Sequence, residues 1–239
     1  MSTLLLRLAS PLQSWGCDDK FIRRGTTHEP TKSGVIGLLA AALGRSRESD
    51  LSDLTMLKFG VRSDQPGQLL RDYHTACFDK KKPPYVTERY YLSDAVFLVG
   101  LEGDDGLLQR LDEALNEPAF PLFLGRRSCP PSGRISLGVR KSPLKQALHE
   151  ESWQASLWYQ KRSSDNPRLT LTLDAEKTSA YTRRDTPLSF DQSHRKYVLR
   201  HVEEKAEAVA VINNYKCTGN ETEHNPFAEL EGDNVLIQD

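Results

Sequence analysis

Two short segments of the 239-residue chain place a pair of arginines beside a glycine, a pattern that suits contact with phosphate groups. Residues 23–25 read Arg-Arg-Gly, and residues 125–128 read Gly-Arg-Arg-Ser. A glycine lets a ligand approach the backbone closely, and guanidinium groups present forked donors that match phosphate oxygens. A solvated turn with two ordinary arginines is the alternative. We interpret both segments as candidate phosphate contacts, with Lys20 as a further cation near the first.

A tryptophan and two polar residues follow the first apolar run of the chain. Residues 13–15 read Gln-Ser-Trp and come after an expected strand at residues 4–9. Binding of single-stranded RNA requires cations along the phosphates and flat side chains on which unstacked bases can lie. Trp15 could provide such a surface, but a Trp beside a strand end also commonly fills a core. The sequence leaves both roles open.

A lysine and small residues stand at the start of an expected apolar helix. Residues 32–34 read Lys-Ser-Gly, and the apolar run over residues 35–43 ends at Gly44. The pattern predicts a helix with Ser33 as its N-cap and Gly44 at its C-terminal end. Free N–H groups at a helix N-terminus attract anions, so this segment is a candidate for phosphate contact. A plain N-cap is compatible with that role.

One segment contains residue types that could cleave RNA. Residues 71–74 read Arg-Asp-Tyr-His. Cleavage without a metal needs a base for the 2′-hydroxyl and an acid for the leaving oxygen, which His74 with Tyr73 or Lys80 would supply. Adjacent residues of a strand point to opposite faces, however, so Tyr73 and His74 would not naturally share one pocket. We prefer RNA contact or core packing for them and keep a metal-independent endoribonuclease as the alternative.

Three lysines followed by two prolines form a stiff basic stretch. Residues 79–84 read Asp-Lys-Lys-Lys-Pro-Pro. Adjacent lysines repel one another and prolines remove backbone donors, so this stretch suits neither a central strand nor a helix interior. A solvated face is the ordinary interpretation of such lysines. Because the prolines stiffen the stretch, we interpret it as an exposed basic excursion that grips a nucleic-acid backbone.

The distribution of charge separates a basic body from an acidic end. The formal net charge is −1, but residues 1–200 carry 30 Lys and Arg against 24 Asp and Glu, whereas residues 201–239 carry 2 against 9. A partner meets one face and not the average, so the near-neutral total does not exclude nucleic acid. The composition, with 38% hydrophobic and 27% charged residues, excludes a disordered or fibrous chain.

Missing patterns argue against several other classes of protein. No apolar run approaches the ~18 residues of a membrane helix, and the four cysteines show neither CxxC spacing nor a nearby His at metal-ligand spacing. We therefore expect reduced thiols, no metal, no cofactor, no membrane contact and a cytoplasmic location.

The order of the expected elements predicts an α+β fold. Apolar runs bounded by turn residues indicate strands at 4–9, 58–63, 68–75, 95–101 and 122–124, and helices at 33–43, 50–57 and 104–116. This is the order of a ferredoxin-like (RRM-like) βαββαβ palm. We place the palm in residues 1–150, with a projecting basic thumb around residues 76–94.

The rest of the chain changes character after residue 150. Residues 151–202 read as a smaller, mostly β portion, with strands expected at 156–161, 169–173 and 193–202. Residues 203–239 read as an acidic, mobile tail, with one further strand conceivable at 208–212.

Four collinear blocks of sequence carry a resemblance to a known family. They are residues 7–16 (RLASPLQSWG), 30–39 (PTKSGVIGLL), 71–75 (RDYHT) and 124–130 (LGRRSCP). In these blocks the chain resembles the CasD subunits of Cascade, the type I-E CRISPR surveillance complex. Each block alone is weak, but together they are specific, and residues 181–185 and 194–198 resemble the family's closing segment. The lysine-rich stretch and the acidic end have no counterpart that we can match residue by residue.

The resemblance implies a RAMP-type RNA-binding subunit with a ferredoxin-like palm, which caps the 5′ handle of the CRISPR RNA in a ribonucleoprotein of antiviral defence. Family members contact the large CasA subunit and the end of the CasC backbone, and they do not cut RNA in this subtype. We therefore expect a non-catalytic subunit with CRISPR RNA, CasA and CasC as partners, and contact with target DNA stays open. The residues expected to bind RNA are Gln13, Trp15, Lys20, Arg23, Arg24, Lys32, Ser33, Gly34, Arg71, Tyr73, His74, Lys80, Lys81, Lys82, Gly125, Arg126, Arg127 and Ser128.

Overall fold

The computed structural model describes residues 1–16, 23–77, 84–164, 166–175, 178–179, 181–211 and 213. The candidate contacts Lys20, Lys80, Lys81 and Lys82 therefore lie outside the described residues, as does the acidic end from residue 214.

The elements are β1 (Ser2–Ala9), β2 (Leu12–Gln13), β3 (Arg23–Arg24), α1 (Lys32–Ala42), α2 (Ser52–Thr55), β4 (Lys58–Gln65), β5 (Gln68–Ala76), β6 (Tyr85–Ser93), β7 (Val96–Gly103), α3 (Asp105–Asn116), β8 (Ser136–Arg140), α4 (Leu144–Glu150), α5 (Leu157–Arg162), β9 (Arg168–Asp174), β10 (Thr182–Ser189) and β11 (Lys196–Ala210). Within these described ranges no helix is long and apolar enough to cross a membrane.

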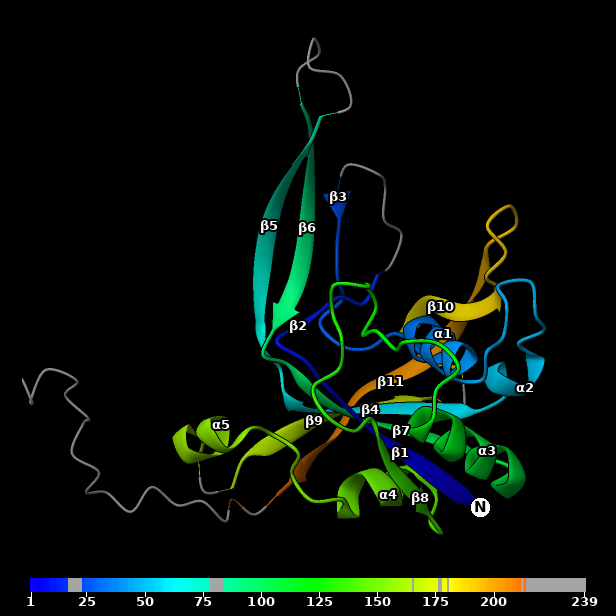
Figure 1. Ribbon diagram of the computed structural model, residues 1–239. Helices are drawn as coiled ribbons and strands as arrows, with labels where there is room; N and C mark the ends of the chain where they lie inside the picture. The colour runs from blue at the N-terminus through cyan, green and yellow to red at the C-terminus, as the bar shows by residue number, and fades with distance from the viewer. Residues whose placement is uncertain are drawn as a thin grey trace, which may run out of the picture.

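Seven antiparallel strands form the central sheet, in the order β10-β11-β9-β4-β7-β1-β8 (Figure 1). The strands expected at 4–9, 58–63 and 95–101 are confirmed as β1, β4 and β7. The strand expected at 122–124 is wrong, because the backbone of Leu124 is engaged locally: its N–H donates to Cys129 O at 2.8 Å and its carbonyl accepts from Ser14 N at 3.2 Å. The strand beside β1 is instead β8, with Leu4 opposite Val139.

Both faces of the central sheet are covered. Alternate residues of β1 point to opposite faces, so Leu4, Leu6 and Leu8 join one apolar cluster with α1, α2 and α3, whereas Leu5 joins a second cluster with α4. Figure 1 shows α1 and α3 on one side of the sheet and α4 on the other. This explains why β1 and β7 read as nearly continuous apolar runs.

A long hairpin of β5 and β6 projects from the body (Figure 1). Its register runs from Gln68 opposite Ser93 to Ala76 opposite Tyr85, and the two short strands β2 and β3 also pair with β6. No strand was expected at residues 23–24, so the parallel pairing of β3 with β6 corrects the expected order of elements. The first arginine pair is thereby held beside the middle of the hairpin.

Helix α1 begins one residue earlier than the sequence pattern suggested. Thr31 is its N-cap, and the Thr31 hydroxyl accepts a hydrogen bond from the backbone N–H of Gly34 at 3.2 Å. Ser33 therefore lies inside the first turn, which corrects its expected role as N-cap. The expected C-terminal end is confirmed, because Gly44 follows the helix with a φ of 72°, a conformation that favours glycine. Helix α3 and its N-cap Asp104 agree with the acidic start expected from residue 104.

The C-terminal strands continue the central sheet. Strand β9 pairs with β4, β11 with β9, and β10 with β11. The strand expected at 156–161 is wrong, because this segment forms helix α5, which begins after Ser156. Residues 203–210, expected as the start of the tail, lie in β11, and Val209 and Val211 belong to the second apolar cluster.

Candidate nucleic-acid interface

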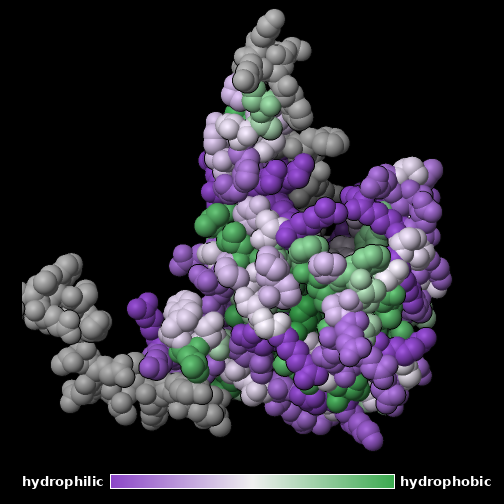
Figure 2. All heavy atoms as spheres, viewed as in Figure 1, coloured by the Kyte–Doolittle hydropathy of each residue, from purple (hydrophilic) through white to green (hydrophobic). Residues whose placement is uncertain are grey.

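A groove of about 680 Å³ lies where three distant parts of the chain meet. Helix α1 and the residues after it line it together with the irregular segment that ends at Arg127 and the connection between β10 and β11. Figure 2 shows apolar side chains bordered by hydrophilic ones, with a hollow between them, on this side of the body. The lining residues expected from the sequence are Ser33, Gly34, Gly125 and Arg127.

Four arginines surround the groove: Arg45, Arg47, Arg127 and Arg195. Arg45 is paired with Asp53 through two hydrogen bonds of 2.6 and 2.5 Å, and this pairing holds the pKa of the Asp53 carboxyl below its ordinary value. The other three are exposed and make no ion pair with any residue that the structure describes. They are therefore free to contact phosphate groups.

Four aromatic residues and a row of small residues give the groove an apolar lining. The aromatic residues are Phe120, Phe123, Phe190 and Tyr197. Opposite them, α1 presents glycines and alanines, and Phe190 lies so close to this helix that a Cβ atom on Gly37 would sit 3.6 Å from its ring. Because bases stack on aromatic side chains, the groove combines the two requirements for binding single-stranded RNA.

The two arginines at positions 126 and 127 have different surroundings. Arg127 is exposed, whereas Arg126 donates hydrogen bonds to the carbonyl oxygens of Tyr90, Arg24 and Gly25 at 3.2, 2.9 and 3.1 Å. Its guanidinium also lies 4.7 Å from the centre of the Tyr91 ring. Arg126 therefore fastens its segment to β6 and β3, and these contacts use three of its five N–H donors within the protein.

The hydroxyl of Tyr91 lies among donors from the same segment. Burial opposes ionisation of Tyr91, but hydrogen bonds with Ser128 and Arg126 outweigh the burial, so the pKa of Tyr91 is lower than its ordinary value. Ser128 remains exposed and accessible to a ligand.

The middle of the hairpin carries a chain of polar contacts. Arg23 lies 5.0 Å from the centre of the Tyr90 ring and donates to the Tyr90 hydroxyl at 3.3 Å. The same hydroxyl donates to Glu88 at 3.3 Å, and Glu88 is ion-paired with Arg71. Arg23, Arg24 and Arg71 are exposed, so they flank the hairpin as accessible cations.

Tyr73 and His74 lie on the exposed strand β5. His74 contacts the carboxylate of Asp72, two residues away on the same face, whereas Tyr73 is 61% exposed and lies opposite Glu88. Neither lines the groove. The structure thus does not bring this expected acid–base pair into one pocket.

Gln13 and Trp15 are completely buried, which corrects their expected contact with RNA. Gln13 donates to the carbonyl oxygens of Leu8 and Ala95 at 3.1 and 2.7 Å and accepts from the indole N–H of Trp15 at 3.1 Å. The Trp15 ring packs against Gly34, where an added Cβ atom would lie only 2.8 Å from the ring. Of the two roles that the sequence left open for Trp15, filling the core is the one observed.

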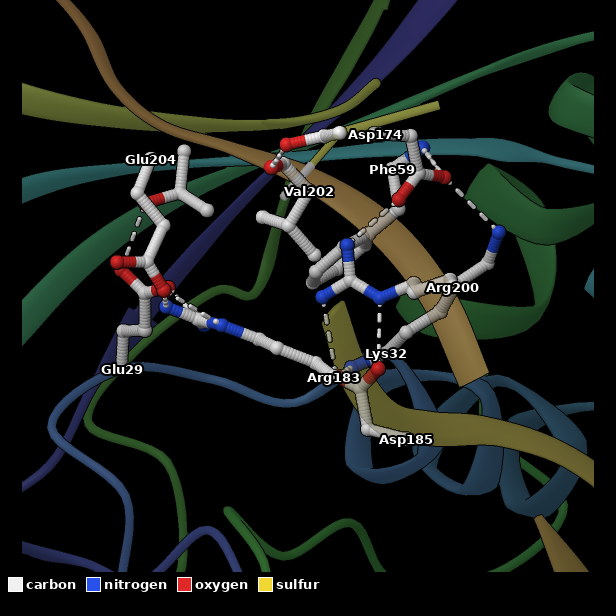
Figure 3. A network of polar contacts seen from close by, with 11 residues as sticks. Glu29, Lys32, Phe59, Asp174, Arg183, Asp185, Arg200, Val202 and Glu204 are labelled. Carbon is white, nitrogen blue, oxygen red and sulfur yellow. Dashed lines mark hydrogen bonds and ion pairs between the residues drawn. The ribbon is translucent and has the colours of Figure 1, made fainter. Parts of the chain in front are cut away.

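Lys32 is also withdrawn from the surface. Its ammonium group is ion-paired with Asp174 at 3.0 Å, and its backbone N–H donates to Asp185 at 2.9 Å (Figure 3). With Thr31 occupying the N–H of Gly34, two donors of the first helical turn are already used. The expected anion site at the start of α1 is therefore corrected: protein carboxylates and a hydroxyl fill it.

Sequence reasoning missed all four of the groove's aromatic residues and three of its four arginines. Arg45 and Arg47 follow α1, Phe120 and Phe123 precede Gly125, and the remaining missed residues, Phe190, Arg195 and Tyr197, flank the β10–β11 turn. A local signal existed for Phe123, because this aromatic residue lies two positions before the Gly-Arg-Arg segment. No local signal links the β10–β11 turn to α1.

The groove contains none of the residue clusters typical of metal sites. Across the described ranges, no three His, Cys, Asp or Glu side chains gather where they could hold a metal ion. Of the four cysteines, Cys77 is exposed and Cys129 is buried, and the other two lie outside the described residues.

Comparisons with known proteins agree on one family. The family model described as CRISPR-associated protein (Cas_Cas5) matches residues 3–203. The CRISPR system Cascade subunit CasD of Escherichia coli (strain K12) is 36% identical over 174 residues, which cover 63% of this chain and 77% of that protein. A structure described as a crystal structure of a Cas protein is 42% identical with a TM-score of 0.69, covering 87% of this chain and 95% of that one. A chain of a CRISPR RNA-guided surveillance complex is 32% identical with a TM-score of 0.74, covering 90% and 92%.

Proposed function

The chain belongs to the CRISPR-associated Cas5 family, and we propose that it is a non-catalytic Cascade subunit that binds the 5′ handle of the CRISPR RNA. Its similarity to the CasD subunit of Escherichia coli and to a chain of an RNA-guided surveillance complex supports membership of such a complex. Within it, CasA and CasC are the proposed protein partners and the cytoplasm the proposed location.

The observation that carries the proposal is the groove beside α1. Three exposed arginines, Arg47, Arg127 and Arg195, line it together with four aromatic side chains. Duplex nucleic acid keeps its bases stacked inside the helix, so an apolar lining between cations suits a single strand whose bases are splayed out. A 5′ handle is such a single strand.

The topology supports a ferredoxin-like palm with a thumb. The four strands β4-β7-β1-β8 are neighbours in that order, and α1 and α3 are the two helices that connect them along the chain. This order is consistent with a βαββαβ arrangement in which β7 and β1 are the two central strands. The β5–β6 hairpin projects from the palm and carries Arg71, which fits the role of a thumb (Figure 1).

Binding to a labelled RNA with the CRISPR 5′ handle, compared with the same RNA lacking the handle, tests the proposal. We expect the full chain to prefer the handle RNA and its affinity to fall steeply with salt, because each phosphate contact releases counterions. Arg127→Ala and Arg195→Ala should each weaken binding and reduce the slope of log Kd against log salt by about 0.7.

Arg110 provides the matched control for this experiment. It is an exposed arginine on α3, a helix with acidic neighbours, and it does not line the groove. Arg110→Ala should leave both the affinity and the salt slope unchanged. Equal binding of the two RNAs, or equal effects of the three substitutions, would contradict the proposal.

The non-catalytic part of the proposal has its own test. Incubation of the full chain with CRISPR repeat RNA in EDTA should leave the RNA intact, because His74 contacts the carboxylate of Asp72, while Tyr73 points to the other face of β5. Cleavage that disappears in His74→Ala would establish the endoribonuclease alternative instead.

A further inference from the structure

We propose that Asp185 and Arg200 are positioning residues for the groove, which set the distance between its β10–β11 wall and helix α1. The inference rests on the proposed RNA binding and concerns how the site is held in shape. Neither residue lines the groove. Both act through Phe190, Arg195 and Tyr197, which form the wall and lie between them in the sequence.

Asp185 connects the wall to the start of α1. One of its carboxylate oxygens accepts the backbone N–H of Lys32, the first residue of the helix, at 2.9 Å (Figure 3). The same carboxylate receives two hydrogen bonds from Arg200, at 2.6 and 3.0 Å. Because Asp185 lies on β10 and Arg200 on β11, this bidentate pair joins both strands of the wall to the helix that forms the opposite side of the groove.

Asp174 extends the same network into the central sheet. It accepts from Arg200 at 2.6 Å, from Lys32 at 3.0 Å and from the backbone N–H of Phe59 at 3.0 Å. The Arg200 guanidinium also lies 5.2 Å from the centre of the Phe59 ring. The wall is thus fastened to α1, β9 and β4 at once, and Figure 3 shows Arg200 reaching between the two carboxylates.

The network is buried and electrically balanced. Asp185, Arg200 and Lys32 are each less than one tenth exposed, and with Asp174 they amount to two carboxylates against two cations. A balanced network adds no net charge beside the groove, so its effect on an anionic ligand must come from geometry. Hydrogen bonds among charged groups are short and directional, which suits them to fixing a distance.

A second ion-paired group holds the far end of the wall. Arg183 of β10 is paired with Glu29, which lies just before α1, and with Glu204 of β11 at 2.6 Å. Glu29 also accepts from Thr172 of β9 at 3.1 Å. Contacts at two points along β10 prevent the strand from pivoting about Asp185.

The chain offers a matched control at another buried ion pair. Arg62 and Asp64 are completely buried, with hydrogen bonds of 2.7 and 2.8 Å between them, and Arg62 also donates to the carbonyl oxygens of Leu148, Glu151 and Ser152. This pair fastens the segment after α4 to β4 and does not touch the groove. Asp185→Asn leaves Arg200 paired with Asp174 alone, whereas Asp64→Asn leaves Arg62 with backbone carbonyls only, so the control should cost at least as much stability.

The test measures handle-RNA affinity of the full chain carrying Asp185→Asn or Asp64→Asn, at a temperature where both variants are folded by circular dichroism. We expect Asp185→Asn to raise Kd about five- to tenfold, which corresponds to the usual interaction energy between residues of one hydrogen-bonded network. Asp64→Asn should leave Kd unchanged. The salt slope should stay at the wild-type value in Asp185→Asn, because no phosphate contact is removed.

The direction of the change in Kd for handle RNA distinguishes a positioning role of Asp185 from an electrostatic one. Asp185→Asn removes a negative charge near an RNA site, so an electrostatic role alone predicts tighter binding, whereas positioning predicts weaker binding. The inference would be overturned if Asp185→Asn bound RNA as tightly as the wild type or more tightly. It would also be overturned if both variants lost affinity in proportion to the fraction of unfolded protein. If Asp185→Asn does not fold, Asp185→Glu is tested instead, because it keeps the negative charge but lengthens the side chain by one methylene and so displaces β10. An unchanged Kd for Asp185→Glu would then overturn the inference.

Failure of the proposed function gives a different result. In that case the wild-type chain itself shows no preference for the handle RNA, and none of the variants changes this. A wild-type preference that Asp185→Asn and Asp185→Glu both retain leaves the proposed function in place and removes only the positioning role.

Discussion

The backbone of Gly125 lies against the carbonyl oxygen of Ser14, so closely that a Cβ atom on Gly125 would sit 1.6 Å from that oxygen. Gly125 also has a φ of 90°, a conformation that side chains rarely adopt. The contact joins the segment carrying Arg127 to the backbone that follows β2. Gly125 is therefore required both by its conformation and by the space available, which explains a glycine directly before the arginine pair.

Gly125→Ala should strongly destabilise the protein and displace this segment. Backbone strain of about 1–3 kcal/mol adds to the clash with Ser14, so we expect the free energy of unfolding in urea to fall by more than ~2 kcal/mol. Gly133→Ala is the control, because Gly133 has a similar φ of 82° but no atom within 4 Å of an added Cβ. It should cost about 1 kcal/mol, from the conformation alone. Equal losses in the two variants would show that the contact with Ser14 is unimportant.

The fold was predictable where a segment had a strong, uninterrupted pattern. The apolar runs of β1 and β7 and the leucine stripe of α3 each indicated one kind of element. The elements that were not predicted correctly are short segments whose sequence is compatible with more than one kind of secondary structure. Residues 157–162 contain aromatic residues typical of strands, yet form α5, and β8 contains Gly138 and pairs with an irregular register.

The candidate site was predictable only in its local part. Gly125 and Arg127 share one short segment and were found together, whereas Phe190, Arg195 and Tyr197 belong to a hairpin that joins the sheet through the pairing of β11 with β9 and of β9 with the distant β4. The burial of Trp15 depends on the missing side chain of Gly34, and the burial of Lys32 depends on Asp174. Such pairings between distant residues leave no periodicity in the sequence.

Truncation should distinguish the end of β11 from the acidic residues that follow. Ending the chain at residue 204 removes Val209 and Val211 from an apolar cluster, so we expect loss of cooperative thermal unfolding. Ending it after Asn213 keeps these residues and removes six acids and one lysine. That variant should bind handle RNA as tightly as the full chain or more tightly, since like charges repel. Weaker binding after removal of residues 214–239 would contradict this.

Glu102 should make stability depend on pH. Its carboxylate accepts from the backbone N–H of Leu144, at the start of α4, at 2.7 Å and pairs with Lys58 at 3.0 Å. Burial raises the pKa of Glu102, but these two contacts outweigh it, so the pKa is below its ordinary value. A lowered pKa contributes stability that is present above the unfolded value of about 4.3 and is lost as pH falls through the folded value.

Glu102→Gln isolates this contribution. At pH 7 the variant should lose about 1.5–3 kcal/mol of unfolding free energy in urea, because a hydrogen bond to a charged group is lost. The difference from the wild type should shrink progressively below about pH 4, where the wild-type carboxylate becomes protonated. A difference that is independent of pH would show that packing, and not the charge of Glu102, stabilises the start of α4.

The two described cysteines should differ sharply in reactivity. Cys129 is completely buried behind the Arg126–Arg127 segment, and burial raises the pKa of its thiol, whereas Cys77 is exposed at the end of β5. The thiolate is the reactive form, so iodoacetamide at pH 8 should modify Cys77 at least about tenfold faster than Cys129. Tryptic peptides separate the two sites for mass spectrometry, and in denaturant the rates should converge. Gly125→Ala should accelerate modification of Cys129 in the native protein, because the segment that covers it is displaced; an unchanged rate would show that this segment keeps its position without the contact to Ser14.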